Sequence, residues 1–306
     1  LIDDTDANYI AVIFDRARKT FRSEIYTDYK ANRPPPPDEL IPQFQLVRDA
    51  TEAMNVPAID MDGFEADDLI ATYARQAAEA GAKVTIVSSD KDLMQLVTDK
   101  VTMLDAMKNR VIGHEQVVEK FGVGPDRVVD VQSLAGDSTD NVPGVQGIGV
   151  KTAAQLINEY GDLNTLLANA KEIKQPKRRE RLIEQADMAR ISRELVRLDQ
   201  NVPVTEAWES FAVKSPDPNV LLPFLKEQKF RSLVSTMEAR LSVEPGDRVA
   251  GGSGDAGLDE ASYELVQTED ALKAWIAEAD EAGAVAVDTE TTSLNSMQAE
   301  LVGVSL

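Results

Sequence analysis

The chain has 306 residues, a formal net charge of -21 and no cysteine, which excludes disulfides and thiolate metal sites. The single histidine, His114, excludes a zinc site built from several histidines. No apolar stretch is long enough to span a membrane and no signal-peptide pattern is visible, so we expect a cytoplasmic protein that does not enter membranes.

Basic residues gather in two clusters before position 240, although the chain as a whole is acidic. Charge runs of this kind are usually solvated faces, so alone they give weak support for phosphate binding. The clusters are Arg16, Arg18, Lys19, Arg22, Lys30 and Arg33, and then Lys171, Lys174, Lys177, Arg178, Arg179 and Arg181.

The first predicted element is a buried parallel strand. Residues 9–14 form a continuous apolar run that ends at Asp15. A basic segment with interleaved aromatic residues follows, and the prolines at 34–37 predict an extended connector. We expect a helix over 38–54, and then a short strand and loop over 57–62.

Three carboxylates, Glu65, Asp67 and Asp68, open an amphipathic helix predicted over 65–80. Acidic side chains in a first helical turn complement the helix dipole. Glu65 and Asp68 also share a helix face, which suits a metal site. The residues of this stretch leave both interpretations open.

More carboxylates follow the next predicted strand, over 83–88. Asp90 and Asp92 come directly after it, and the carboxyl edge of a parallel sheet is where sites form. A hairpin is predicted at 101–104 and 110–112, with helices at 115–121 and 126–134. Asp137 and Asp140 come next, and a simple capping turn is the alternative to a metal site there.

A glycine-punctuated hairpin over 143–153 leads into a helix predicted at 152–160. Closely spaced glycines let backbone N–H groups approach a phosphate. Helices are expected over 163–199 and 216–240, and a flexible linker over 241–262. A strand at 263–266, a helix at 269–282 and a strand at 284–287 then begin a new domain.

Six motifs occur in an order that resembles the 5′ nuclease (flap endonuclease) family, as found in bacterial DNA polymerase I. They are Phe14-Asp15, Tyr29-Lys30-x-x-Arg33, Glu65-Ala66-Asp67-Asp68, Asp90-Lys91-Asp92, Gly136-Asp137 to Asp140-Asn141, and the Gly144–Ala153 hairpin. The resemblance covers residues 1 to about 240. Asp288-Thr289-Glu290-Thr291 resembles the start of a 3′–5′ proofreading exonuclease domain.

The resemblance implies an α/β fold with a mostly parallel sheet flanked by helices, of the PIN-like type. Residues 1–135 would form this core, with a helical arch at about 16–40. Residues 136–240 would form a helix-hairpin-helix subdomain, and 263–306 the start of a ribonuclease-H-like α/β domain.

The resemblance also implies site residues. It assigns two or more divalent metals, Mg²⁺ or Mn²⁺, to Asp15, Glu65, Asp67, Asp68, Asp90, Asp92, Asp137 and Asp140, and an incomplete second site to Asp288 and Glu290. It gives Lys30 and Arg33 a catalytic role at the scissile phosphate. DNA contacts are expected from Arg22, Tyr29, Gly144, Gly147, Gly149, Lys151 and Thr152, with a monovalent cation at the hairpin. Packing of Tyr29 within the arch is an equal alternative to stacking on a base.

The resulting hypothesis is a monomeric 5′–3′ exonuclease or flap endonuclease acting on DNA with 5′ flaps, nicks or RNA primers. The alternative is a non-catalytic duplex-binding module that uses the hairpin. The family's domain begins with a strand bearing a further metal-ligand aspartate, upstream of residue 1. We therefore expect the chain to be a fragment with impaired activity.

Overall fold

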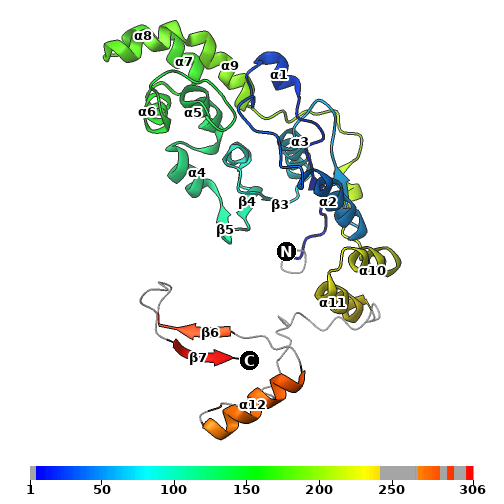
Figure 1. Ribbon diagram of the computed structural model, residues 1–306. Coiled ribbons are helices and arrows are strands. Elements are labelled where there is room, and N and C mark those ends of the chain that lie inside the picture. The colour runs from blue at the N-terminus through cyan, green and yellow to red at the C-terminus, as the bar shows by residue number, and fades with distance from the viewer. Residues whose placement is uncertain (1–4, 242–265, 267, 283–287, 293–300, 306) are drawn as a thin grey trace. The chain divides into compact units, whose positions relative to one another are not determined.

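The computed structural model describes residues 5–241, 266, 268–282, 288–292 and 301–305 (Figure 1). The chain divides into two compact units, residues 1–243 and 244–306. In the described parts of the chain, no helix is both long and apolar enough to cross a membrane.

A two-stranded parallel sheet lies near the start of the first unit. Strand β1 (Val12–Ile13) pairs with β2 (Ala58–Ile59), with Val12 opposite Ala58. The parallel pairing was expected, but the strand is shorter than residues 9–14 and is not buried. Side chains alternate along a strand, so Ile13 packs toward Leu69 and Phe211 whereas Val12 remains 36% exposed.

A second sheet is mixed, and Asp90 and Asp92 follow its first strand. Strand β3 (Val84–Val87) pairs in parallel with β4 (Val101–Asp105), which pairs antiparallel with β5 (Arg110–Ile112). The β4–β5 hairpin is confirmed. The α/β class with mostly parallel pairing is also confirmed, since β1–β2 and β3–β4 are parallel and only β4–β5 is antiparallel among the described strands of this unit; these strands form two small sheets.

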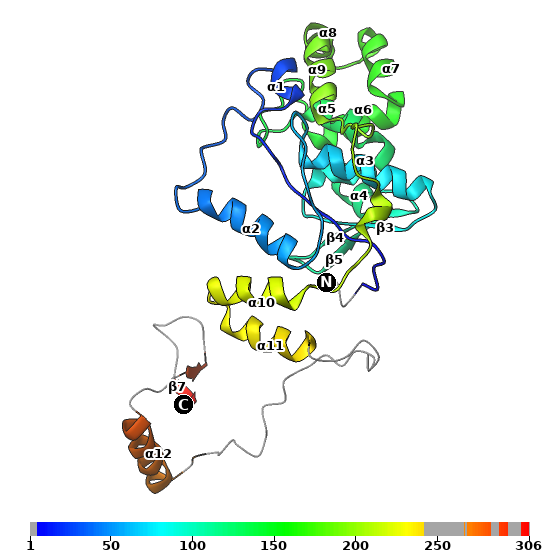
Figure 2. The same ribbon diagram turned by 90° about the vertical axis from the view of Figure 1, so that its right-hand side faces the viewer.

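Helices make up about half of the described part of the first unit, and the expected helical regions are present (Figure 2). The helical arch is the exception, because in residues 16–40 only α1 is helical and residues 27–32 form turns. The helices are α1 (Phe21–Ile25), α2 (Ile41–Ala53), α3 (Ala66–Glu79), α4 (His114–Phe121), α5 (Val128–Ala135), α6 (Val150–Tyr160), α7 (Leu163–Ala168), α8 (Pro176–Glu184), α9 (Ala186–Val196), α10 (Pro218–Glu227) and α11 (Arg231–Leu241). Short 3-10 helices are η1 (Lys91–Leu96), η2 (Pro125–Arg127), η3 (Ala170–Glu172) and η4 (Trp208–Phe211).

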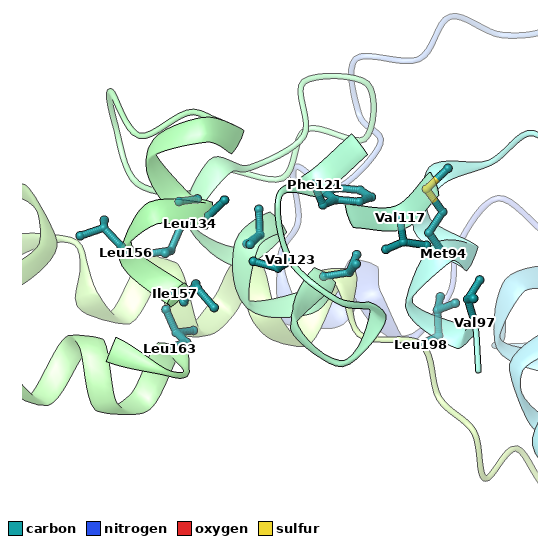
Figure 3. Packing of buried hydrophobic residues seen from close by; sticks show 14 of the residues in the cluster. Met94, Val97, Val117, Phe121, Val123, Leu134, Leu156, Ile157, Leu163 and Leu198 are labelled. Carbon is teal, nitrogen blue, oxygen red and sulfur yellow. The ribbon is translucent and has the colours of Figure 1, made fainter. Parts of the chain in front are cut away.

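One hydrophobic core joins the mixed sheet to the helices α4–α9. Met94 of η1 and Phe121 of α4 belong to the same cluster as Leu134 of α5 and Ile157 of α6 (Figure 3). Buried side chains in close contact leave little room for relative movement. The acidic segments that follow β3 and α5 are therefore attached to one packed core.

The second unit contains α12 (Glu269–Ala282) and two antiparallel strands, β6 (Asp288–Thr291) and β7 (Leu301–Ser305). The bounds of α12 agree with the predicted helix. The predicted strand at 284–287 lies outside the described residues, as do the linker at 241–262 except for Leu241, which ends α11, and the strand at 263–266 except for Val266.

Candidate active site

A polar cavity of about 320 Å³ brings together four of the predicted carboxylates, Asp90, Asp92, Asp137 and Asp140. These residues come from two segments that are separated by more than forty positions in the sequence. The cationic side chains of Arg33, Lys91 and Lys120 also line the cavity, together with Ser89 and Thr139.

Asp90 and Asp92 are placed by the end of β3 and the start of η1. Asp90 is the N-cap of η1, and its Oδ1 accepts a 2.9 Å hydrogen bond from the N–H of Asp92. The Asp92 carboxylate accepts a hydrogen bond from the Gln132 side chain on α5. The strand, the cap and α5 thus fix both carboxylates on the carboxyl side of β3.

A tight turn places Asp137 and Asp140. Asp137 and Val142 exchange backbone hydrogen bonds of 2.9 and 2.7 Å, and Asp137 Oδ1 accepts 2.8 Å from the Thr139 N–H. A Cβ at Gly144 would lie 2.8 Å from the Gly136 Cα, so glycine allows the two backbones to cross. The segment is a turn, as considered from the sequence, but it caps no helix, since α5 ends at Ala135 and the N-cap of α6 is Gly149. Both carboxylates line the cavity.

The start of α3 is held by carboxylates, as the helix-start interpretation requires. Glu65 is the N-cap and forms a capping box with Asp68. Asp15, which follows β1, accepts a 2.8 Å hydrogen bond at Oδ1 from the N–H of Ala66. Asp15 therefore lies at the same helix end as Glu65 and Asp67.

Lys30 joins the two acidic regions. Its Nζ lies 2.8 Å from Glu65 Oε1 and 3.7 Å from Asp140 Oδ2. Its backbone N–H donates to the Asp140 carbonyl at 2.9 Å, and Arg33 also pairs with Asp140. The start of α3, the turn at 137–142 and the segment around Lys30 consequently form one site.

Tyr29 is buried, with 8% of its surface exposed, and its hydroxyl donates to Glu65 Oε2 at 3.1 Å. Its ring packs with Val142, Leu195 and Val196. Of the two interpretations considered for this residue, packing is the one that the structure has, and the ring is not presented for stacking on a base. Burial, followed by the charge of Glu65, raises the pKa of Tyr29.

Arg22, which the sequence interpretation placed among the residues expected to contact DNA, lies inside the protein. Its side chain is fully buried and forms a bidentate pair with Asp68, at 2.6 and 2.7 Å. Asp68 is fully buried as well, so it faces Arg22 instead of the cavity. The basic run around Arg22 suggested a surface position because nothing local in the sequence indicates its buried acceptors.

The electrostatics of the site favour added positive charge. Burial, then the charges of Asp90 and Glu65, raises the pKa of Asp67 to about 7. Burial and Asp90 likewise raise the pKa of Asp92 to about 6. For Asp137, burial acts in the opposite direction to the hydrogen bonds from Lys91 and Thr139, and the hydrogen bonds hold its pKa below the usual value.

The donor set suits hard divalent cations. Carboxylate oxygens are the ligands that Mg²⁺ and Mn²⁺ prefer. Neighbouring carboxylates add to the effect of burial in raising the pKa values of Asp67 and Asp92, so a bound cation would relieve their repulsion. In the described residues, no three acidic, histidine or cysteine side chains are already arranged around a metal position. Ion pairs with Lys30, Arg33 and Lys91 hold the carboxylates of Glu65, Asp140 and Asp137 toward internal cations.

The hairpin before α6 has the backbone expected for a phosphate-binding turn. Gly144 and Gly147 have positive φ angles of 61° and 76°, and Gly149 is the N-cap of α6. Lys151 is exposed and Thr152 half-buried in the first turn. Arg181 of α8 donates to the Gln146 carbonyl at 2.9 Å, and its guanidinium lies where a Cβ of residue 147 would be.

Several contributors were not singled out from the sequence. Lys91 is 2.6 Å from Asp137, and its place between Asp90 and Asp92 was the available signal. Gln132 and Lys120 carry no local pattern that separates them from ordinary helix-surface residues, whereas Arg181 belongs to the second basic cluster but its contact with the hairpin was not predicted. Asp288 and Glu290 lie on β6, opposite Ser305 and Gly303.

Comparisons with known proteins agree with this geometry. Residues 1–122 match the family described as 5′-3′ exonuclease, N-terminal resolvase-like domain, and residues 123–219 match 5′-3′ exonuclease, C-terminal SAM fold. Residues 263–306 match 3′-5′ exonuclease.

Relatives and solved structures extend the match. The chain is 46% identical over 360 residues to DNA polymerase I of Rhizobium leguminosarum, covering 97% of this chain and 35% of that protein. It thus spans about a third of the length of such relatives. A structure of the bacteriophage T5 flap endonuclease with DNA and metal ions has a similar fold, with a TM-score of 0.59 and 23% identity, covering 74% of this chain and 85% of that one.

A shorter relative matches over most of its own length. The 5′-3′ exonuclease of Aquifex aeolicus is 35% identical over 240 residues, covering 78% of this chain and 81% of that protein. With both halves of the exonuclease also matched in order along residues 1–219, the chain belongs to the 5′–3′ exonuclease family.

Proposed function

We propose that the chain is the divalent-metal-dependent 5′ nuclease part of a DNA polymerase I. Its substrates would be DNA with 5′ flaps, nicks or RNA primers, and the reaction hydrolysis of a phosphodiester during primer removal and repair. The observation that supports this most is the cavity shared by Asp90, Asp92, Asp137 and Asp140, with Lys30 connecting it to Glu65.

Seven carboxylates would hold the metals: Asp15, Glu65, Asp67, Asp90, Asp92, Asp137 and Asp140. Bound divalent cations supply a deprotonated water and stabilise the leaving oxygen in phosphodiester hydrolysis. Mg²⁺ or Mn²⁺ is the proposed ion. Lys30 and Arg33 would exchange their carboxylate partners for phosphate oxygens and stabilise charge at the scissile group.

The hairpin would hold the duplex. Gly149 leaves open space at the position that a Cβ would take, whereas Gly144 and Gly147 give the turn its positive φ angles. A phosphate would meet the backbone of these three glycines at the N-terminus of α6, where Lys151 and Thr152 also favour an anion. Such contacts grip the backbone without reading sequence. A monovalent cation at the hairpin belongs to the same proposal.

The wider setting is also proposed. The protein would act as a cytoplasmic monomer, with residues 1–135 as the nuclease core, 136–240 as the duplex-binding part and 263–306 as the start of a proofreading domain. In that domain Asp288 and Glu290 would be the first metal ligands.

Cleavage of a labelled 5′ flap with and without Mg²⁺ tests the function. The experiment uses the full-length protein and its Asp137→Asn variant. Loss of a metal ligand should cost at least about 100-fold, because even the outer partners of a metal site are worth about 10- to 100-fold. The control is Asp126→Asn, because Asp126 is exposed and is not among the residues that line the cavity.

Three outcomes separate the hypotheses. Metal-dependent cleavage that is lost in Asp137→Asn, with flap binding retained, supports the nuclease. Undiminished cleavage in that variant contradicts the metal assignment. Salt-dependent duplex binding by the wild type without any metal-dependent cleavage would favour the non-catalytic binding module instead.

A further inference from the structure

We propose that Arg22 and Asp68 form a positioning pair for the active site, and that neither contacts metal or DNA. The pair would hold the start of α3, the segment that leads to Lys30, and the end of α9 in one arrangement. This inference rests on the proposed nuclease function and assigns two of the predicted site residues a different role.

The Arg22 guanidinium donates its hydrogen bonds to groups within the protein. Its two terminal nitrogens donate to Asp68 at 2.6 and 2.7 Å. Nε donates to the Leu195 carbonyl at 2.8 Å, and Nη2 donates to the Arg197 carbonyl at 2.9 Å. A guanidinium fork that is engaged in this way has no orientation left in which to meet a phosphate.

Asp68 is equally occupied. Besides Arg22, it accepts from the Glu65 N–H at 3.1 Å and from the Asp199 N–H at 2.8 Å. Since both carboxylate oxygens are bonded and the side chain is fully buried, a metal at Asp68 would have to displace Arg22 and leave its charge buried and unpaired. That cost opposes a ligand role.

The pair reaches the reacting region through Glu65. The Asp68 carboxylate accepts a hydrogen bond from the Glu65 N–H, and Arg22 Nη1 lies 3.6 Å from Glu65 Oε2. Glu65 in turn holds Tyr29 and Lys30. Arg22 begins this chain of contacts from α1, and its bonds to the end of α9 tie the helical part to the same point.

Neutralising the pair stepwise tests its role. The variants are Arg22→Gln, Asp68→Asn and the double variant, each compared with the wild type and with Asp67→Asn in the full-length protein. Each single variant leaves a buried group without its charged partner, whereas the double variant restores a neutral hydrogen-bonded pair. Flap-cleavage kcat and KM are measured well below each variant's Tm, and the Tm gain on adding Mg²⁺ gives a readout that does not depend on activity.

We expect each single substitution to lower kcat by roughly 10- to 100-fold, with KM for the flap changed by less than about threefold, because misplacement at a distance affects the reaction more than binding. The kcat of the double variant should be at least about tenfold higher than the kcat of Asp68→Asn. The double variant should also recover most of the Mg²⁺-induced Tm gain. Asp67→Asn should lose that gain, and adding Arg22→Gln should not restore it.

The inference is overturned if the double variant loses as much as the two single losses multiplied, because Asp68 would then act independently of Arg22, as a ligand would. The inference is also overturned if the double variant recovers the Tm of the wild type but recovers neither kcat nor the Mg²⁺-induced Tm gain, since the pair would then be structural only. If the wild type does not cleave flaps, the proposed function fails, and the Mg²⁺-induced Tm gain alone decides the role of the pair.

Discussion

Substitution of Gly144 by alanine tests whether the backbone crossing at Gly136 holds the active-site turn. Gly144 has φ +61°, and a Cβ there would lie 2.8 Å from both the Ala135 carbonyl carbon and the Gly136 Cα. A left-handed backbone costs a residue other than glycine about 1–2 kcal/mol. Overpacking against backbone that cannot rotate away adds about 1–3 kcal/mol.

The expected loss of stability for Gly144→Ala is about 2–4 kcal/mol, after allowing about 0.4–1 kcal/mol for the reduced freedom of the unfolded chain. For a unit of this size, such a loss lowers Tm by roughly 5–15 °C. Thermal and guanidinium unfolding followed by circular dichroism measure it. Flap cleavage should fall as well, because the crossing positions Asp137 and Asp140.

Two other glycines separate the backbone cost from the overpacking cost. Gly161 has φ +92° but no atom within 4 Å of the position that a Cβ would take, so Gly161→Ala should show only the backbone cost of about 1–2 kcal/mol. Gly149 has a negative φ and an equally open Cβ position, so Gly149→Ala should change stability by less than about 0.5 kcal/mol. If Gly144→Ala loses no more than Gly161→Ala, the crossing does not constrain the turn.

Two further predictions concern charge. The pKa of Asp67 is raised to about 7, so the folded state without metal keeps a proton that the unfolded chain releases near pH 4, and its contribution to stability is lost as pH rises from about 4 to about 7. Thermal melts in EDTA should show this loss of stability between about pH 4 and about pH 7. The Asp67→Asn variant should lack the contribution of Asp67 to the loss, and Mg²⁺ should reduce the loss in the wild type. An unchanged pH profile of stability in the variant would contradict the raised pKa of Asp67. Arg181→Gln should weaken duplex binding and reduce the salt slope by about 1, whereas Lys226→Gln on α10 should not, and equal slopes would exclude Arg181 from the duplex surface.

Local patterns were sufficient for the elements that depend on nearby residues. The apolar periodicity after Glu65 predicted α3 to within a residue at each end, and the β4–β5 hairpin was equally clear. The acids Asp90 and Asp92 follow a strand, and their meeting with Asp137 and Asp140 was implied by the family's motifs rather than by spacing.

Partners distant in the sequence were not predictable in this way. Glu65 and Asp68 share a helix face, but Asp68 turns to Arg22, which is 46 positions away. Arg22 itself is held by the Leu195 carbonyl, 173 positions away, and nothing in the basic run around it signals that acceptor. Burial, rather than residue type, decided which charged side chains face the cavity.

The shared core has a consequence for dissecting the molecule. The two exonuclease halves meet between residues 122 and 123, yet Phe121 and Val123 lie in the same buried cluster as Leu134 and Leu163. A cut at that boundary would expose apolar surface on both pieces. The two halves match separate sequence families, but because they share this buried cluster we expect them to unfold together, and limited proteolysis should spare the boundary at 122–123.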